Sequence, residues 1–365
     1  MKPLVYRLCF VLSALSFATH ADGITSEKIT VPAQNAELQG YRFRSPSREV
    51  DINKWVVFTH GLGSNLHEFE SLIPEFVAAG YDCYAFNFRG HGNGAERSLV
   101  TDYREGDYRL EKMAEVDFPA IVAHIQSLHP GKGVVVGHSM GGMVPRGSFA
   151  QGLVSKDQVE SMVLLGSPPH FETMKKDRQS LDLLGLLNIT ETFLNLGPGN
   201  QDVGWAALID TLEIPLDLVN FYSLPYWLAK DFLKSINPAE WLARALSRKI
   251  PKDILRSFAS YTRQDYPYAE VKIPVPILHI MGEKDRLARH GDIEEHTPLQ
   301  SEDAGYWLVK MRGVDHLGLV TLKVVKAFRN VMFEFISKDG RLGASHKSYF
   351  EILSPSCEEK LRAPK

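Results

Sequence analysis

The sequence has few cysteines, with three in 365 residues. Cys9 lies in an N-terminal segment that we expect to be removed, which leaves Cys83 and Cys357 in the mature chain. So few thiols exclude a small disulfide-stapled scaffold. Cys83 lies in the apolar run YDCYAFNF, so its default interpretation is a small core residue. A Cys83–Cys357 disulfide in an oxidising compartment is the alternative.

An excess of charge of either sign is also lacking. The net charge is −3, which gives no electrostatic reason to expect a nucleic-acid partner or an anionic membrane surface. Beyond the N-terminal segment there is no apolar run of about 20 residues, so we expect no internal membrane span. The 13 histidines form no H-x-H or H-E-x-x-H pattern, and no G-x-G-x-x-G or P-loop is present. We therefore expect no metal and no nucleotide cofactor, and nothing in the sequence predicts a protein partner.

The N-terminus has the pattern of an export signal. Lys2 and Arg7 precede the apolar run 8–18, and small residues follow as far as Ala21. This pattern predicts a signal peptide over residues 1–21, cleaved after Ala18 or Ala21, and an exported protein that is periplasmic or secreted. The alternative is a membrane anchor, but the apolar run is short for a span.

Short apolar runs alternate with helical patterns along most of the chain. The runs predict strands at 28–31, 38–43, 55–59, 83–87, 134–137, 162–165, 275–281 and 306–311. The central runs are continuously apolar, as in strands that are covered on both faces. Apolar repeats at helical spacing lie at 69–77, 110–128 and 319–336. This alternation predicts an α/β fold with a mostly parallel central sheet flanked by helices.

The alternation of strand and helix patterns stops in the middle of the chain, so we expect an insert there that separates two parts of the core. We expect residues 22–167 and 271–340 to form the two parts of the α/β core. Residues 168–270 are rich in leucine, aromatics and proline and contain no clear strand, so we expect a helical cap inserted over one edge of the sheet. The alternative is that residues 168–270 are ordinary crossover helices of the core that have become longer in evolution. Residues 341–365 are a polar tail that we expect to be loosely attached.

The segment VVVGHSMGG contains the most specific motif of the chain. It places a G-x-S-x-G pattern between an apolar strand and a helix, with Ser139 at its centre. A nucleophile in such a pattern lies on a tight, strained turn that exposes its hydroxyl. Gly137, Gly141 and Gly142 remove side chains that would collide where strand and helix approach each other. Ser139 is therefore the candidate nucleophile.

A serine hydroxyl needs a base, and the base needs an orienting group. Asp285 follows the strand VPILHIM in GEKD, and His316 lies in the loop VDH before the last helix. The chain order Ser139, Asp285, His316 is the order expected of this strand–turn–helix architecture. Glu283 and Asp315 compete with Asp285, but we expect Glu283 to be solvated. Asp315 adjoins His316 in sequence, which turns its side chain elsewhere.

Developing negative charge on a substrate requires backbone donors. Met140 follows the nucleophile and supplies one N–H group. The loop HGLG follows the strand VVFT, and the N–H group of Leu62 is the second candidate. Gly61 lets the backbone approach the substrate, so we assign it to substrate binding together with His60 and His138. The His60 ring is nevertheless better suited to bracing the loop, and the His138 ring to packing or forming a minor pocket wall.

These motifs together resemble the α/β-hydrolase fold family, in particular its lid-bearing lipase- and esterase-like members. HGLGS at 60–64, FRGHGNG at 88–94, GHSMGG at 137–142, GEKD at 282–285 and DH at 315–316 follow in the family's order. The resemblance implies that Ser139 is the nucleophile, His316 the base, Asp285 its partner, and Leu62 and Met140 the oxyanion donors. In FRGHGNG we expect Arg89 and His91 to anchor a loop. A serine at position 139 argues against relatives that use an aspartate there, such as epoxide hydrolases.

The expected activity is hydrolysis of carboxylic esters, through an acyl-enzyme on Ser139. The apolar insert favours hydrophobic acyl groups, so the expected substrate is a small-molecule or lipid ester, with contact to a lipid interface through the cap. One alternative is an acyltransferase, thioesterase or amidase that uses the same three residues. An alternative of another class is a non-catalytic binding protein on a hydrolase scaffold.

Overall fold

The structure is a computed structural model. It describes residues 23–46, 54–168, 200–204, 244–261, 266–268, 271–285, 287–288, 305–340, 342, 349–352 and 361–362. The predicted signal peptide (residues 1–21), most of the predicted cap (168–270) and most of the tail (341–365) lie outside the described residues. Those predictions therefore stay predictions.

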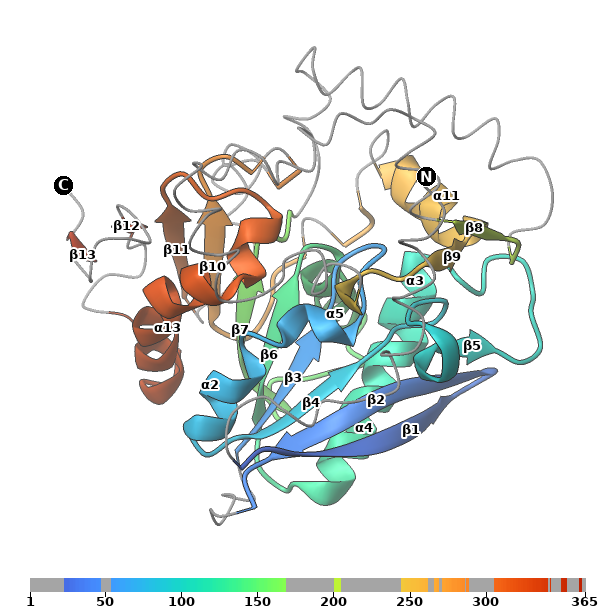
Figure 1. Cartoon of the computed structure of the whole chain (residues 1–365), viewed down its shortest axis with the longest axis horizontal. Helices are drawn as coiled ribbons and strands as arrows, with labels where there is room; N and C mark the ends of the chain where they lie inside the picture. The colour runs from blue at the N-terminus through green and yellow to red at the C-terminus, as the bar shows by residue number, and fades with distance from the viewer. Residues whose placement is uncertain are drawn as a thin grey trace, which may run out of the picture.

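Across the described ranges, eleven strands form one central sheet (Figure 1). Its strands lie in the order β1-β2-β4-β3-β6-β7-β10-β11-β12-β13, with β5 paired to β2. Their bounds are β1 (Thr25–Ala33), β2 (Ala36–Arg44), β3 (Trp55–Thr59), β4 (Asp82–Phe86), β5 (Leu99–Val100), β6 (Gly133–His138), β7 (Val159–Leu165), β10 (Ile277–Gly282), β11 (Tyr306–Met311), β12 (Tyr349–Ile352) and β13 (Leu361–Arg362). The pairs from β4 through β12 are parallel, while β1, β2, β5 and β13 are antiparallel to their neighbours.

The central strands have the composition expected of a sheet that is covered on both faces. Every residue of β3, β4, β6 and β10 is buried. Alternate residues enter different cores: Val57 and Val135 join one apolar cluster, whereas Val56 and Val134 join the other. Because both faces exclude water, an alternating polar pattern is absent, which is why these strands read as continuous apolar runs.

Helices cover both faces of the sheet. On one face lie α3 (Leu110–Lys112), the π-helical turn η3 (Met113–Asp117), α4 (Phe118–Leu128), α5 (Met140–Ala150) and α11 (Lys252–Tyr261). The other face carries η1 (Leu66–Phe69), α2 (Ile73–Ala78), η5 (Leu317–Val320) and α13 (Leu322–Ser337), and η2 (Gly94–Glu96) lies in the loop before β5. The predicted mostly parallel sheet with flanking helices is thus confirmed. None of the helices in the described part of the chain is long and apolar enough to cross a membrane.

Two segments differ from what the sequence pattern predicts. Within the predicted helical insert, β8 (Asp202–Gly204) pairs with β9 (Lys249–Pro251), so the expectation of no strand there is wrong. In the polar tail, β12 pairs with β11 and β13 pairs with β12, which adds tail segments to the edge of the sheet. These strands are two to four residues long. Runs this short carry no periodicity, so only pairing with a partner strand defines them.

Cys83 agrees with its interpretation as a core residue. It lies on β4, is buried, and is a free thiol in the described structure. Its Sγ atom contacts the backbone oxygens of Tyr81 at 3.6 Å and Ile73 at 4.0 Å. Burial raises the pKa of this thiol, which keeps it protonated and unreactive. Cys357 lies outside the described residues.

Candidate active site

Ser139 lies on a strained turn between β6 and α5. Its φ of 52° and ψ of −123° lie in a region that residues with a side chain rarely adopt. From Gly133 to Phe149, Ser139 is the one residue that is not buried. The Ser139 N–H group donates to the carbonyl of Leu165 on β7 at 3.0 Å, which fixes the turn against the neighbouring strand. The strained turn thus leaves Ser139 half-buried in an otherwise buried stretch.

The glycines of the turn allow α5 to approach the end of β3. A Cβ atom on Gly141 would lie 1.9 Å from the carbonyl oxygen of Thr59. Pro145, inside α5, has no N–H group to bond the carbonyl four residues earlier, which belongs to Gly141. The hydroxyl of Thr59 donates to that carbonyl instead, at 2.7 Å. The end of β3 therefore replaces the helical hydrogen bond that Pro145 removes.

We predict that Gly141→Ala lowers the free energy of unfolding by about 3 kcal/mol, since the new methyl group meets backbone that has no room to move. Chemical denaturation measures this change. Gly152→Ala is the matched control, because a Cβ on Gly152 meets open space and only its φ of 68° is unfavourable, so the expected loss is about 1 kcal/mol. Equal losses in the two variants would show that the close approach does not matter.

Asp285 and His316 meet at the carboxyl ends of β10 and β11. Nδ1 of His316 lies 2.7 Å from Oδ2 of Asp285, whose side chain is fully buried. The other oxygen, Oδ1, accepts from the N–H groups of Leu287 at 2.9 Å and Ala288 at 2.8 Å. Two backbone N–H groups thus donate to this carboxylate, and an N–H group on Nδ1 of His316 would complete the set of donors while leaving Nε2 on the other side of the ring.

The two competing carboxylates lie elsewhere, as the sequence predicts. Glu283 is exposed and accepts from the Gly313 N–H group at 2.8 Å. Asp315 accepts from the Gly318 N–H group at 2.8 Å and so helps to form the turn into η5. The sequence-predicted Asp285 is thus the carboxylate that contacts the His316 ring.

The Asp285–His316 pair lies beside the loop after β7 and beside the residue that precedes Ser139. A Cβ on Gly166 would lie 2.8 Å from Oδ2 of Asp285 and 3.2 Å from Nδ1 of His316, so the loop after β7 passes directly beside this pair. The ring of His138, the residue before Ser139, lies 4.7 Å from the ring of His316 between centroids. The nucleophile candidate and the base candidate therefore come from adjacent parts of the structure.

The loop after β3 lies against the serine turn. A Cβ on Gly61 would contact Cβ of Ser139 at 3.3 Å, which is closer than most side chains tolerate. Glycine at this position thus keeps space beside the nucleophile. Leu62 follows it and is half-buried, whereas Met140 is buried as the first residue of α5. The first N–H groups of a helix have no partner within the helix, so the Met140 N–H group is suited to bind an oxyanion.

His60 supports this loop with its ring. The ring is fully buried, with Nδ1 2.9 Å from the carbonyl of Gly61 and Nε2 accepting from the Phe88 N–H group at 3.1 Å. Burial lowers the pKa of His60 to about 4, so the ring is neutral. Both nitrogens are engaged by backbone, which corrects the placement of the His60 ring among the substrate-binding residues and agrees with its expected bracing role.

Arg89 and His91 anchor the next loop, as the sequence predicts. Arg89 and Asp117 form a fully buried ion pair, with Nη2 2.6 Å from Oδ1, and Asp117 ends the π-helical turn before α4. The His91 ring accepts from the Gly63 N–H group at 3.4 Å and packs 4.7 Å from the His60 ring. The loop that carries Leu62 is therefore held by two buried rings.

The sequence does not predict one buried pair at this site. The carboxylate of Glu68, on η1, lies 2.8 Å from Nδ1 of His138 and accepts from the Gly61 N–H group at 2.9 Å. Nε2 of His138 lies 3.1 Å from the carbonyl oxygen of His316. His138 is buried and both nitrogens are occupied, which corrects its assignment to substrate binding. No sequence signal marks Glu68, because a glutamate in NLHEFE reads as a solvated helical residue.

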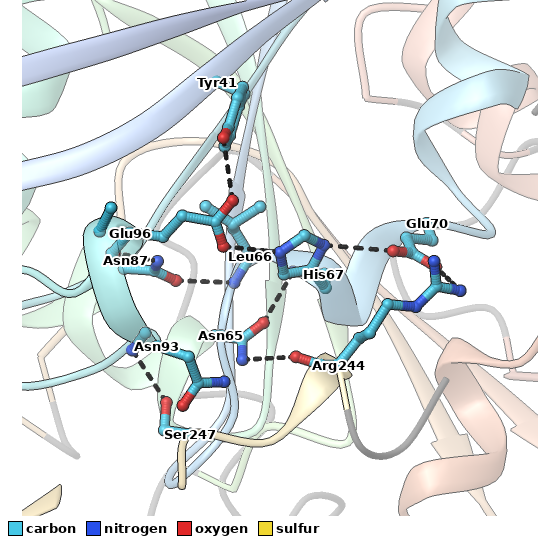
Figure 2. Close-up of polar contacts among 12 residues, drawn as sticks. Tyr41, Asn65, Leu66, His67, Glu70, Asn87, Asn93, Glu96, Arg244 and Ser247 are labelled. Carbon is cyan, nitrogen blue, oxygen red and sulfur yellow. Dashed lines mark hydrogen bonds and ion pairs between the residues drawn. The ribbon is translucent and has the colours of Figure 1, made fainter. Parts of the chain in front are cut away.

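The last part of the predicted insert is fastened to the same loop. Figure 2 shows the Asn65 amide donating to the carbonyl of Arg244, at 2.7 Å, and the Arg244 guanidinium beside Glu70, at 3.1 Å. His67 lies between Glu70 and Glu96, at 3.2 and 2.9 Å. Burial alone would lower the pKa of His67, but the two carboxylates outweigh it and raise the pKa to about 9. The ring is therefore charged near neutral pH.

Backbone contacts continue this attachment. Ser64 Oγ donates to the carbonyl of Ala245 at 2.8 Å, and the Ser247 N–H group donates to the carbonyl of Gly63 at 2.8 Å. Ser247 Oγ accepts from the Gly92 N–H group at 2.9 Å. The chain just after the undescribed part of the insert thus lies directly on the loop that carries Leu62. Among the described residues, no group of histidine, cysteine and carboxylate side chains is arranged to hold a metal ion.

Comparisons with known proteins agree with this architecture. A sequence model described as the alpha/beta hydrolase fold matches residues 54–298. A monoacylglycerol lipase of Mycolicibacterium smegmatis is 34% identical over 120 residues, which is 32% of this chain and 39% of the lipase. An esterase of Mycobacterium tuberculosis is 26% identical over 175 residues, 43% of this chain and 53% of the esterase. The chain thus spans about half or less of the length of these curated relatives.

Among solved structures, epoxide hydrolase from Vigna radiata superposes with a TM-score of 0.59 over 86% of this chain and 98% of that chain. The two sequences are 15% identical, so the likeness is one of fold alone. The family match, in contrast, covers more than half of the chain and includes the turn with Ser139 and the strand before Asp285. This protein belongs to the α/β-hydrolase fold family.

Proposed function

We propose that the protein is a serine hydrolase that cleaves carboxylic esters through an acyl-enzyme on Ser139. The observation that carries this proposal is the half-buried serine on its strained turn, together with a histidine whose Nδ1 is held 2.7 Å from a buried carboxylate and whose ring packs against the residue before that serine. A hydroxyl becomes a useful nucleophile when a neighbouring base takes its proton. The names of the esterase and lipase relatives support the same class of reaction.

In the proposed first step, Nε2 of His316 takes the proton of Ser139 as Oγ attacks the ester carbonyl. The Leu62 and Met140 N–H groups would bind the oxyanion, each contributing about 3 kcal/mol of transition-state stabilisation. His316 then gives its proton to the leaving alcohol as the carbon–oxygen bond breaks. Water, deprotonated by His316, attacks the acyl-enzyme and releases the acid and Ser139. Asp285 stays ionised and stabilises the imidazolium in both steps.

For the substrate we propose a hydrophobic acyl ester of a small molecule or a lipid. The apolar composition of residues 168–270 supports this choice, and so does the name of the monoacylglycerol lipase relative. The same segment would form the cap and contact a lipid interface. The basic and apolar N-terminal pattern supports export with cleavage after Ala18 or Ala21.

Hydrolysis of p-nitrophenyl esters of graded acyl length tests this function. We expect turnover with all short and medium esters and an optimum above acetyl, because burial of each additional CH₂ contributes about 0.8 kcal/mol of binding. An added acceptor alcohol separates a hydrolase from an acyltransferase, since a transferase would form the transesterified product. Absence of turnover with every ester, in a folded preparation, would contradict the proposal.

A further inference from the structure

Glu68 and His138 connect three parts of the site that are distant in sequence. One oxygen of the Glu68 carboxylate lies 2.8 Å from the His138 ring, and the other accepts from the Gly61 N–H group at 2.9 Å. The far side of the His138 ring reaches the carbonyl oxygen of His316 at 3.1 Å. This buried pair thus joins the loop that carries Gly61 and Leu62, here called the oxyanion loop, to the backbone of His316. One of its members, His138, directly precedes Ser139.

The hydrogen-bond partners of the His138 ring indicate that this ring is positively charged. Both nitrogens of His138 face acceptors, a carboxylate and a carbonyl, so both are satisfied only when both carry protons. The nearby His60 ring faces one acceptor and one donor and is satisfied as a neutral ring. Burial disfavours the charged form of His138, but Glu68 outweighs it and the pKa of His138 is raised. Likewise burial opposes ionisation of Glu68, but the His138 charge outweighs it and lowers the pKa of Glu68.

We propose that Glu68 and His138 are positioning residues, which fix the oxyanion loop relative to the His316 loop and place a positive charge beside the His316 ring. The His138 ring centroid lies 4.7 Å from that of His316, and the ring contacts Glu68 through Nδ1 and the His316 carbonyl through Nε2. The positively charged member of the pair therefore lies beside the proposed base. This inference rests on the proposed function, since it assigns His316 as that base.

The positive charge of His138 acts on the His316 ring in a definite direction. A cation beside the His316 ring repels a second positive charge there, so it favours the neutral form of the proposed base. Asp285 acts in the opposite sense, because its carboxylate favours the His316 cation. The charged or titratable groups that face His138 are Glu68, Asp285, His316 and His60, and His60 is neutral. The pair thus balances part of the charge of Asp285 at the base.

The Glu68→Gln variant separates the effect of the charges from the effect of the hydrogen bonds. The glutamine oxygen accepts from the Gly61 N–H group, and its NH₂ group donates to Nδ1 of a neutral His138. Nε2 of His138 then still donates to the His316 carbonyl. Every hydrogen bond is kept while both charges are removed, so a purely structural role predicts unchanged pH behaviour.

The measurement is the rate constant for labelling by a fluorophosphonate probe, followed from about pH 5 to 9. We expect the acid limb of the Glu68→Gln profile to move to higher pH by roughly half a unit or more, with a plateau within about threefold of the parent. His138→Gln is the second variant, and it moves the limb in the same direction because the cation is lost while Glu68 remains. An acid limb that stays in place in both variants would overturn the inference.

The control is Asp82→Asn. Asp82 is a buried carboxylate at the amino end of β4, where it binds Arg42 at 3.0 Å and His129 at 3.2 Å. The candidate site lies at the carboxyl ends of the parallel strands. This variant also breaks a buried ion pair, so we expect a lower free energy of unfolding with an unmoved acid limb. A parent protein that is not labelled at any pH would instead contradict the proposed function, which is a distinct outcome.

Discussion

Replacing Ser139 by alanine will lower kcat for ester hydrolysis by at least about 100,000-fold. The change removes the oxygen that would form the proposed acyl-enzyme, and Ser139 is the described serine with a positive φ. The fold should be retained, because the Ser139 backbone keeps its bond to the Leu165 carbonyl. Steady-state kinetics and chemical denaturation of the purified variant measure the two effects.

Ser167→Ala is the matched control. Ser167 is a fully buried serine close to the same turn, since its Oγ atom would lie 2.3 Å from a Cβ on Gly142. Its hydroxyl has no hydrogen-bond partner among the described residues, so its removal should leave kcat within about twofold. A Ser139→Ala variant that keeps its activity, or a Ser167→Ala variant that loses it, would show that the nucleophile is misassigned.

Asp285→Asn will lower kcat by about 10,000-fold while leaving the fold in place. The asparagine oxygen would keep the bonds from the Leu287 and Ala288 N–H groups, so its NH₂ group would face Nδ1 of His316. Nδ1 must then be an acceptor, which moves the imidazole proton to Nε2. In the proposed mechanism Nε2 takes the serine proton, so a proton already on Nε2 would block the base.

Asp315→Asn is the control for this variant. Asp315 adjoins His316 in sequence but, within the described part of the chain, accepts from the Gly318 N–H group at 2.8 Å, and an asparagine oxygen can do the same. We expect kcat within about threefold of the parent. If Asp315→Asn were the damaging change and Asp285→Asn the mild one, the identity of the acid would have to be reversed.

The sequence predicts those parts of the site that depend on residues close to one another in the chain. The turn at Ser139 needs glycines at fixed offsets, and Asp285 and His316 each follow an apolar strand, so their places at one edge of the sheet follow from the parallel topology. The continuous apolar runs likewise predict the central strands to within a few residues, because a sheet covered on both faces leaves no alternative pattern.

The parts that escaped prediction depend on contacts between distant segments. Glu68 and His138 are 70 residues apart, and nothing in NLHEFE indicates that its glutamate is buried against a histidine. In the tail, β12 is a strand only because β11 offers an edge, and β8 only because β9 lies beside it. Such features require the three-dimensional neighbour, which a single sequence does not reveal.

The fold by itself does not select the chemistry. The superposition on an epoxide hydrolase at 15% identity extends over 86% of this chain, yet that similarity says nothing of the residue at the nucleophile position. Here the residue is Ser139, and a serine activated by a histidine, as we propose, is suited to acyl transfer. The assignment therefore depends on the side chains at the edge of the sheet rather than on the sheet.

The central claim is that the histidine and carboxylate make one serine reactive. Fluorophosphonate labelling followed by peptide mass mapping tests it most directly, because the probe bonds covalently to activated serines irrespective of the natural substrate. We predict a single labelled site at Ser139, with labelling lost in the Asp285→Asn variant. A folded protein that takes up no probe, or carries it on a different serine, would contradict the account.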